Sequence, residues 1–584
     1  MNKNMKKKDL KKQNITSFTL KSLFEGKIRW LIFVFLAVLF RSLWVVFQPV
    51  FNAYVFDSIE KGNVILDRIV TLGILFLLWA GISQAFQVIA LNLIVNKINL
   101  DLNKRYIHEI LQKPVQKLAK IGEGKIMTNI TNDIGSVSGI VNRIIDLFNI
   151  PIRMVMAASI LIYSNYKLAI IVLALLPPIT ILAKKIGDVS RKISQSYLTN
   201  TDSQLKIISR ILKTINIIKT YAVENLLKND FIKISFAKYK LEMKKAKYSS
   251  FFSGVIELII ASPFMLLFLL GAFLFQREGI TVAVLLLFLQ LLNYITVPFT
   301  NLSNVYVEYQ QTKVSIERLK EILDSENISK KQEININNTI NSIRFSSTSY
   351  KYKDKLILNN FNFNLSSGKY NAVIGENGSG KSTFIKLLLK LYNPLIGNIS
   401  ANEIDYETLD FEEIRNNRRL VYIEDESKAL FDNFDQNIIL GSVKNESRFR
   451  EVLEAVSLDT IYNDISQKTA DGLSAGQKQR VSIARGLYHV KEGSILIMDE
   501  PFSAIDANGL NKMHELFKSW QKRFNLTIIE ITHNLGDMDR FDHIYMFEDG
   551  KIVLEGNHSS LLKYEKYLNY FNNYRGNNKL LLNS

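Results

Sequence analysis

Six long apolar runs occur before residue 305, and they limit what this chain can fold into more than any other feature. Each run has the length that crosses the roughly 30 Å hydrocarbon core of a bilayer as a helix. The runs therefore predict six membrane-spanning helices in the N-terminal half. They lie near residues 30–50, 69–95, 144–163, 168–186, 251–275 and 280–299.

Positive charge is concentrated between these runs. The net charge is +18, and lysines crowd the first dozen residues and two long stretches, residues 97–125 and 184–247. Loops rich in Lys and Arg stay on the cytoplasmic side, so both termini and both long loops are expected in the cytoplasm. No base-reading motif accompanies the charge, and no nucleic acid partner is expected. The remaining connections, near residues 57–67, 164–167 and 276–279, are short.

The composition indicates one membrane part and one soluble part. A chain of 584 residues is too long for a single compact domain, and its 47% hydrophobic content lies between soluble and purely membrane proteins. The absence of Cys excludes disulfides, thiolate metal sites and a cysteine nucleophile. The basic start leads into an apolar run without a small-residue cleavage site, so it is not expected to be a removable signal peptide.

Polar side chains inside the predicted spans are candidates for a translocation path. Arg41 lies near the middle of the first span, and Gln48 shares its helical face. Gln290 and Asn293 fall on one face of the sixth span. A charge facing lipid costs about 3 kcal/mol or more, so Arg41 should face protein or a water-filled cavity. The alternative is that such residues only pair helices with one another.

A glycine-rich loop, Gly375-Glu376-Asn377-Gly378-Ser379-Gly380-Lys381-Ser382-Thr383, follows a strand-like run and precedes a helical one. Glycines let a backbone wrap closely around phosphates, and the free N–H groups at the helix start bind negative charge. In this context the motif predicts a nucleotide phosphate site. Lys381 is expected to reach the outer phosphates of ATP, and the Ser382 hydroxyl to bind Mg²⁺.

An acidic pair closes a second apolar strand, residues 495–498, about 120 residues farther on. Asp499 is expected to hold the Mg²⁺ shell. Glu500 is expected to orient and activate the attacking water, because phosphoryl transfer needs positioning and charge stabilisation more than covalent chemistry. Together with the phosphate loop, the pair predicts ATP hydrolysis.

The segment Leu473-Ser474-Ala475-Gly476-Gln477, which opens a predicted helix, resembles the signature motif of ATP-binding cassette (ABC) transporters. The resemblance implies that this segment closes over ATP held by the phosphate loop of a second cassette. A single chain would then be unable to complete an ATP site. The resemblance therefore implies a second half-transporter as partner, either another copy, which is favoured because this chain keeps a full set of catalytic residues, or a different chain.

Other segments match the same family in order along the chain. Tyr352 resembles the aromatic residue that stacks on adenine, Asp506 lies in a segment that resembles the loop connecting the two sites, and His533 resembles the switch histidine at the γ-phosphate. In the membrane half, residues 124–133 and 218–224 resemble the two cytoplasmic-loop patterns of ABC exporters. The layout also resembles bacterial exporters of cyclic or modified peptides.

Two segments depart from the family pattern. Where the family places a Mg²⁺-contacting Gln, this chain has Glu424, and no Gln occurs between Arg415 and Asp435. A carboxylate could still bind Mg²⁺ and alter coupling, or the loop could simply have drifted. The residues before the signature, 467–472, lack the usual Glu-Arg-Gly-like stretch, so communication between domains is expected to differ.

The sequence thus predicts an all-α transmembrane domain of six helices, of the ABC exporter type, followed by an α/β P-loop NTPase cassette. The predicted function is ATP-driven export of an amphipathic small molecule or peptide across the plasma (inner) membrane of a bacterium. An importer on an exporter-type scaffold and a nucleotide-gated, channel-like protein are the alternatives. The expected division is a basic cytoplasmic arm at 1–28, the transmembrane domain at 29–312, a linker at 313–340 and the cassette at 341–584.

Overall fold

The computed structural model describes residues 18–174, 207–324, 334 and 339–582, except for positions 209, 213, 279, 353–354, 425–429, 466–471, 504, 506 and 537. The chain divides into two compact units. One consists of Met1–Lys113 and Leu118–Glu326, and the other of Pro114–Lys117 and Asn327–Ser584. Each unit is described by itself below.

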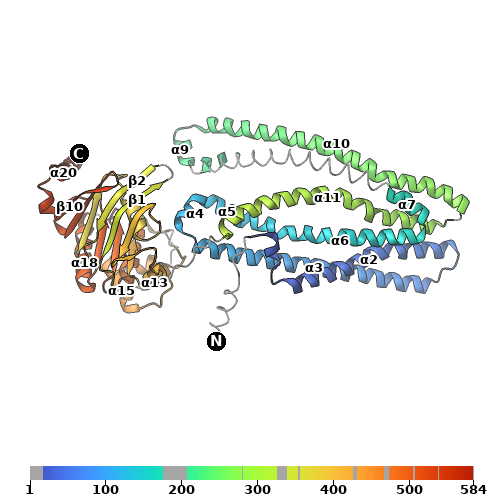
Figure 1. Ribbon diagram of the computed structural model, residues 1–584, viewed down its shortest axis with the longest axis horizontal. Coiled ribbons are helices and arrows are strands. Elements are labelled where there is room, and N and C mark those ends of the chain that lie inside the picture. The colour runs from blue at the N-terminus through green and yellow to red at the C-terminus, as the bar shows by residue number, and fades with distance from the viewer. Residues whose placement is uncertain are drawn as a thin grey trace. The chain divides into compact units, whose positions relative to one another are not determined.

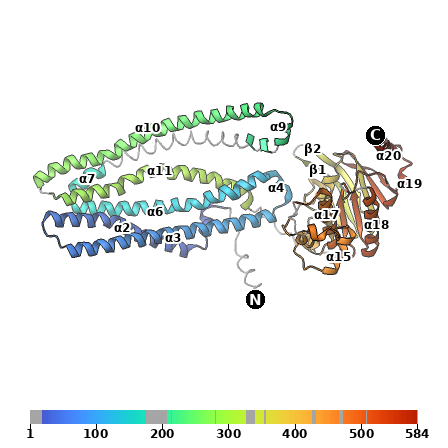
Figure 2. The same ribbon diagram turned by 180° about the vertical axis from the view of Figure 1, so that it is seen from behind.

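The first unit is entirely helical, and its long helices run side by side (Figures 1 and 2). At 1.5 Å per residue, a helix of 47 residues such as α3 is about 70 Å long, more than twice the thickness of a bilayer core. The helices that contain the spans therefore continue well beyond the membrane. The helices are η1 Leu20–Leu23, α2 Ile28–Glu60, α3 Leu66–Gln112, α4 Val115–Ile121, α5 Glu123–Thr128, the π-helical turn η2 Asn129–Asp133, α6 Ile134–Ser164, α7 Tyr166–Ala174, α9 Ile215–Thr220, α10 Glu224–Glu278 and α11 Val282–Leu323.

Three of the described helical stretches are long and apolar enough to cross a membrane by length and composition. They are Ile28–Glu60, Leu66–Gln112 and Glu123–Ser164, which contain the first three predicted spans. The fifth and sixth predicted spans lie in α10 and α11, where shorter apolar stretches are Ala261–Gly271 and Val282–Ile295. Most of the fourth predicted span, residues 168–186, lies outside the described residues.

The outer faces of α2 and α3 carry large apolar side chains. Leu36 is 53% exposed, Leu77 75% and Ile82 61%. So many large apolar groups on the surface of one bundle are unfavourable in water and suit contact with lipid. The exposed faces therefore agree with a membrane-spanning bundle.

The second unit contains two sheets (Figure 1). The larger has the order β10-β9-β3-β8-β7-β6; its central strands are parallel, and β10 closes it with an antiparallel pair. The smaller is antiparallel, with the order β2-β1-β4-β5. The strands are β1 Ile343–Tyr352, β2 Lys355–Asn364, β3 Tyr370–Gly375, β4 Ile396–Ala401, β5 Ile404–Asp405, β6 Leu420–Ile423, β7 Ile495–Asp499, β8 Thr527–Ile531, β9 His543–Glu548 and β10 Lys551–Gly556.

Strand β3 is buried along its whole length because helices pack on the larger sheet and its side chains enter apolar cores. Parallel strands covered in this way bring their carboxyl ends to one edge, where α/β proteins place their ligands. The helices of this unit are α12 Lys381–Leu388, α13 Phe411–Asn416, α14 Phe434–Ile439, α15 Glu446–Ala455, α16 Tyr462–Ile465, α17 Ala475–His489, α18 Ala507–Phe524, η4 Met538–Arg540, α19 His558–Leu561 and α20 Glu565–Leu582.

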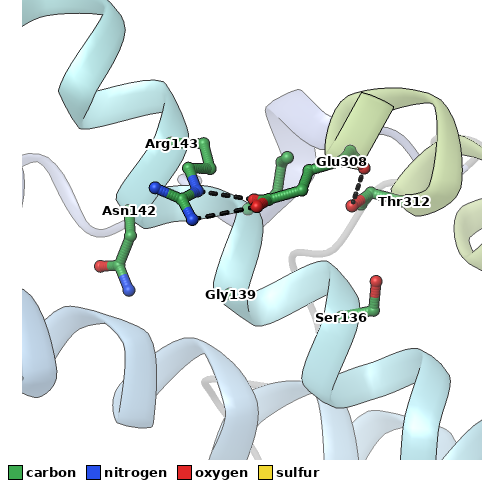
Figure 3. A pocket seen from close by; sticks show the side chains of 7 residues that line it. Ser136, Gly139, Asn142, Arg143, Glu308 and Thr312 are labelled. Carbon is green, nitrogen blue, oxygen red and sulfur yellow. Dashed lines mark hydrogen bonds and ion pairs between the residues drawn. The ribbon is translucent and has the colours of Figure 1, made fainter. Parts of the chain in front are cut away.

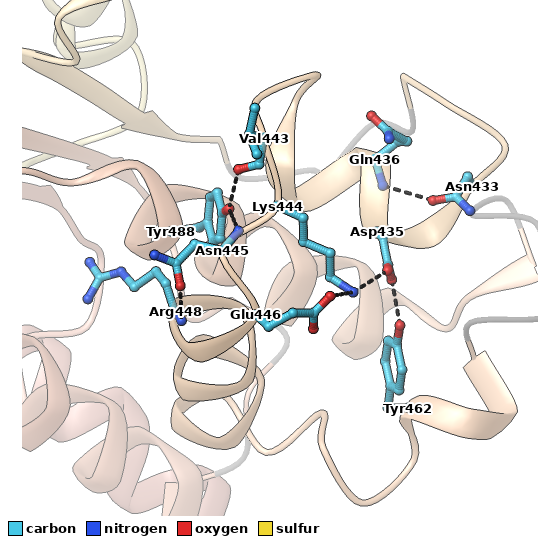
Figure 4. Close-up of polar contacts among 10 residues, drawn as sticks. All are labelled: Asn433, Asp435, Gln436, Val443, Lys444, Asn445, Glu446, Arg448, Tyr462 and Tyr488. Carbon is cyan, nitrogen blue, oxygen red and sulfur yellow. Dashed lines mark hydrogen bonds and ion pairs between the residues drawn. The ribbon is translucent and has the colours of Figure 1, made fainter.

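The helices between β6 and α17 form a lobe held together by polar contacts (Figure 4). Asp435 accepts hydrogen bonds from Lys444 Nζ at 2.9 Å and from Tyr462 Oη at 2.8 Å. Tyr488 of α17 accepts from the backbone N–H of Asn445 at 2.9 Å. Burial, together with the bond to Asp435, raises the pKa of Tyr462 to about 12, so the phenol stays protonated and keeps donating. The lobe is thus hydrogen-bonded to α17, the helix that begins with the signature segment.

Candidate functional site

The phosphate loop connects β3 to α12, as its sequence predicts. Gly375, Gly378 and Gly380 have φ angles of +146°, +85° and +107°, which residues other than glycine rarely adopt. At Gly375 a Cβ atom would lie 2.3 Å from the carbonyl oxygen of Phe547, so the close approach of β9 also requires glycine there. The backbone is thus free to wrap around a bound group, as a phosphate site requires.

Lys381 opens α12 and is 6% exposed. Its Nζ donates to the carbonyl oxygens of Gly375 at 2.8 Å and Glu376 at 2.9 Å, so the side chain lies along the loop. Burial lowers the pKa of Lys381, while the charges of Glu500 and Asp499 act in the opposite direction. Glu376, Asn377, Gly378 and Ser382 are exposed, whereas Ser379, Gly380 and Thr383 are buried.

The acidic pair lies at the carboxyl end of β7, beside the loop. Glu500 has a φ of +46°, a strained conformation for a residue other than glycine, and its N–H donates to Ile531 O at 3.1 Å. Its Oε1 lies 3.1 Å from Nε2 of His533. Both side chains are more than a third exposed, so the pair faces open space in which a water could be oriented. Lys381, Asp499, Glu500 and His533 are therefore gathered at one edge of the sheet.

The signature segment begins α17. Ser474 is its N-cap: its Oγ accepts from Gln477 N at 3.3 Å, and Gln477 Oε1 accepts from Ser474 N at 3.0 Å. This capping box fixes the helix start, where free N–H groups favour an anion. Among the described residues, no hydrogen bond or ion pair joins Ser474 or Gln477 to the phosphate loop of the same chain. Leu473 is buried beneath the segment.

Gln479 is a contact residue that the sequence reasoning did not place in the site. Its Nε2 donates to Ser503 Oγ at 2.9 Å and to Glu500 O at 3.3 Å, and its side chain is buried. The signature helix is thus bonded directly to the backbone of the expected catalytic residue. Its position two residues after the signature segment, which ends at Gln477, was the available sequence signal.

Glu424 makes an ion pair with a residue of α17. Its Oε1 lies 3.2 Å from Arg485 Nη1, and its carbonyl oxygen accepts from Ser482 Oγ at 3.4 Å. Arg485 also donates through Nε to Asn437 O at 2.7 Å. Burial lowers the pKa of Arg485 and Glu424 acts against that, but a guanidinium stays charged in either case. The carboxylate of Glu424 is thus already paired with the Arg485 guanidinium inside the cassette. A contact between Glu424 and Mg²⁺ stays a prediction.

Two remaining candidates in the cassette have different outcomes. Tyr352 ends β1 and is 38% exposed, with its ring edge-on to Tyr350 and Tyr392 at 5.2 and 5.9 Å. An exposed ring on an aromatic support suits stacking on a base. Asp506 lies outside the described residues, as do positions 467–471 of the unusual segment before the signature.

The polar residues of the predicted spans are partly joined to one another. Asn52 Nδ2 donates to Gln290 Oε1 at 2.9 Å, linking α2 and α11. Arg41 Nη1 makes long contacts of 3.4 Å with Ala80 O and Ser83 Oγ of α3. Gln48 is half-buried, and Asn293 is exposed. The assignment of these residues to a translocation path stays a prediction.

A pocket of about 400 Å³ lies between α6 and α11 (Figure 3). Arg143 donates two hydrogen bonds to the Glu308 carboxylate, from Nε to Oε2 at 2.6 Å and from Nη2 to Oε1 at 2.9 Å. Thr312 Oγ1 donates to Glu308 O at 2.9 Å. Because both nitrogens of the fork are engaged, this arginine ties two helices together. The remaining lining residues are Ser136, Gly139, Ile140 and Asn142.

Comparison with known families matches both units. Residues 31–299 match the ABC transporter transmembrane region, and residues 358–503 match the ABC transporter cassette. The order of the two matches is the one predicted from the sequence.

Curated relatives are similar over most of their length. The multidrug resistance-like ATP-binding protein MdlA of Buchnera aphidicola is 30% identical over 463 residues, which cover 75% of this chain and 77% of that protein. The lactococcin-A transport/processing ATP-binding protein LcnC of Lactococcus lactis is 28% identical over 551 residues, covering 91% and 75%.

A solved structure of a bacterial Atm1-family ABC exporter with ATP bound has a TM-score of 0.75 with this chain. The likeness covers 94% of this chain and 98% of that one. At 17% identity it shows that the two share a fold.

Proposed function

We propose that this chain, which belongs to the ATP-binding cassette (ABC) transporter family, works as half of a dimer that exports an amphipathic small molecule or peptide. The protein is an ABC exporter that couples ATP hydrolysis to transport, with a helical membrane region followed by the cassette. The dimer, the class of substrate and the orientation in the membrane are the parts proposed here. Two identical chains are favoured, and a different second half-transporter is the other possibility.

The dimer is supported by one observation: two groups of residues that can bind an anion lie apart in the same chain. Lys381, Asp499, Glu500 and His533 gather at the edge of the sheet, whereas Ser474 caps α17 without a described contact to the phosphate loop. Both have the chemistry that binds phosphate. If the signature of one chain covers the phosphate loop of another, each ATP is held by two chains.

The chemical roles follow from positions in the cassette. The backbone of the phosphate loop and Lys381 hold the phosphates of ATP, and Ser382 and Asp499 supply the oxygens that Mg²⁺ prefers. Bound Mg²⁺ would neutralise charge on the transferring phosphoryl group. Glu500 orients the attacking water, and His533, 3.1 Å away, fixes the direction of that carboxylate. Tyr352 supports the base.

Orientation follows from charge. Lysines crowd the first dozen residues and the stretches at 97–125 and 184–247, and such segments stay on the cytoplasmic side. The termini and the cassette are thus proposed to be cytoplasmic, in the inner membrane of a bacterium. An amphipathic substrate suits a path that combines polar side chains such as Arg41 and Gln290 with an apolar bundle.

Mixed dimers test whether the ATP sites are shared. Lys381→Ala inactivates one phosphate loop and Ser474→Arg one signature, so each variant expressed alone has no intact site. In a mixed dimer both changes fall on the same site and leave the other intact. Random pairing of equal amounts makes half of the dimers mixed, so about a quarter of wild-type ATPase activity is expected. Inactive mixtures, with mixed dimers confirmed by two affinity tags, would show that each chain forms its own site.

Transport in inside-out vesicles tests direction. ATP-dependent accumulation of an amphipathic probe supports export. ATP-driven depletion of preloaded vesicles would instead support import, and passive flux gated by nucleotide would support a channel. The Glu500→Gln variant is the matched control, because it should bind ATP without turning over.

A further inference from the structure

Two arginines inside the membrane bundle lie close together. Arg41 comes from α2 and Arg153 from α6, and both lie within helical stretches that are long and apolar enough to cross a membrane. Nε of Arg153 donates to Oγ of Ser42, the residue next to Arg41, at 3.2 Å. The two guanidinium groups are near enough to repel each other. Charges inside a membrane are costly, and they are retained where they serve substrates or ions.

Among the described residues, neither arginine forms an ion pair with a carboxylate. No carboxylate of the described chain lies within 4 Å of Arg41 or Arg153. Asp146, whose charge acts on Arg153, lies seven residues before it, about 10 Å along α6, and already contacts Arg143 at 3.5 Å. Each guanidinium carries five N–H donors, of which Arg153 uses one in a described contact and Arg41 only Nη1, at 3.4 Å.

Uncharged side chains hold the pair in place. Ser42 is fully buried and donates to Asn149 Oδ1 at 2.6 Å, so the residue that receives Arg153 is itself fixed to α6. Arg41 lies over the Trp44 ring at 4.3 Å. Tyr294 of α11 lies close enough to interact electrostatically with both arginines. Three helices therefore bring two cations and a phenol to one region.

We propose that Arg41, Arg153 and Tyr294 form a site that binds the anionic group, a carboxylate or a phosphate, of the transported amphiphile. A guanidinium matches the geometry of such oxyanions through paired N–H donors, and a phenol adds a further donor. The proposal rests on the proposed export function and names its substrate class. Arg143 differs, because its fork is already taken by Glu308 at 2.6 and 2.9 Å.

The test uses two probes that differ only in charge: an N-acetylated hydrophobic tripeptide with a free C-terminal carboxylate, and its C-terminal amide. ATP-driven uptake is measured in proteoliposomes of pure phosphatidylcholine, where the carboxylate is the only anionic amphiphile. The wild-type protein should take up the carboxylate with a KM about tenfold lower than the amide. Arg153→Gln and Arg41→Gln should abolish this preference for the carboxylate, and Arg153→Lys should restore part of it.

The controls separate the possible failures. Equal KM values for the two probes in the wild-type protein, or an equal loss for both in Arg153→Gln, would overturn the anion site while leaving export intact. If neither probe is transported although ATP hydrolysis is normal, the proposed function fails instead. If stimulation of the ATPase requires added phosphatidylglycerol and disappears in Arg153→Gln, the site holds a lipid headgroup, and the assignment to the substrate is overturned.

Discussion

Glu530 should make the cassette less stable as the pH rises. The residue lies in β8 with no exposed surface. Its Oε2 accepts a hydrogen bond from Tyr370 Oη at 2.5 Å, and Oε1 lies 3.7 Å from Arg540 Nη2 without a hydrogen-bond partner among the described residues. Burial raises the pKa of Glu530 to about 7, although Arg540 and the bond from Tyr370 act in the opposite direction.

The sign follows from proton binding. The usual pKa of 4.5 applies to the unfolded chain, so between that pH and about 7 the folded state binds more protons. Stability therefore falls as the pH rises through this window, and the loss persists above it. A shift of about 2.5 units corresponds to about 3 kcal/mol, of which about 2.5 kcal/mol lies between pH 5 and 8. Glu530→Gln has no such proton to lose.

The assay compares thermal unfolding of the full-length wild-type protein and Glu530→Gln in detergent at pH 5 and pH 8. Fluorescence of Trp520, which is buried in the cassette core, reports this unit once the other three tryptophans are replaced by Phe. The unfolding midpoint of Glu530→Gln minus that of the wild type should increase by roughly 5–10 °C from pH 5 to pH 8. Exposed Glu492→Gln, which removes the same charge, should show no such change. An offset between wild type and Glu530→Gln that is the same at both pH values would refute the reasoning.

Three further predictions concern hydrolysis. Glu500→Gln should lower ATP turnover by about 10²- to 10⁴-fold with ATP binding retained, measured by phosphate release and nucleotide retention; turnover near the wild-type level would remove Glu500 from its role. Gln479→Ala loses two buried bonds, to Ser503 and to the Glu500 backbone. Since these contribute about 1–2 kcal/mol together, kcat should fall roughly tenfold at unchanged KM for ATP, and a rise in KM alone would contradict this. Glu424→Gln weakens the pair with Arg485 and should reduce substrate-stimulated more than basal ATPase. No change in either rate would make Glu424 a bystander.

The local features of this protein could be predicted because each depends on a short stretch of chain. The phosphate loop needs only glycines at fixed spacing between a strand and a helix, and the structure places Gly375 and Lys381 as that spacing requires. Membrane spans depend on the length of an apolar run, so α2, α3 and α6 each contain a predicted one. A capping pattern such as that of Ser474 and Gln477 lies within one helical turn.

The contacts that join distant segments were decided by tertiary structure. Glu424 and Arg485 are 61 residues apart, and they meet because β6 and α17 pack together in the cassette core. No sequence pattern singles out Arg153, because only the packing of α6 on α2 brings it to Ser42, 111 positions away. Sequence patterns record which face of a helix or strand is apolar, whereas the pairing of faces depends on the order β3-β8-β7-β6 and on helix packing. The sequence by itself therefore predicted the ATPase cassette and its candidate residues, and the structure supplied the partners of Glu424 and Arg153.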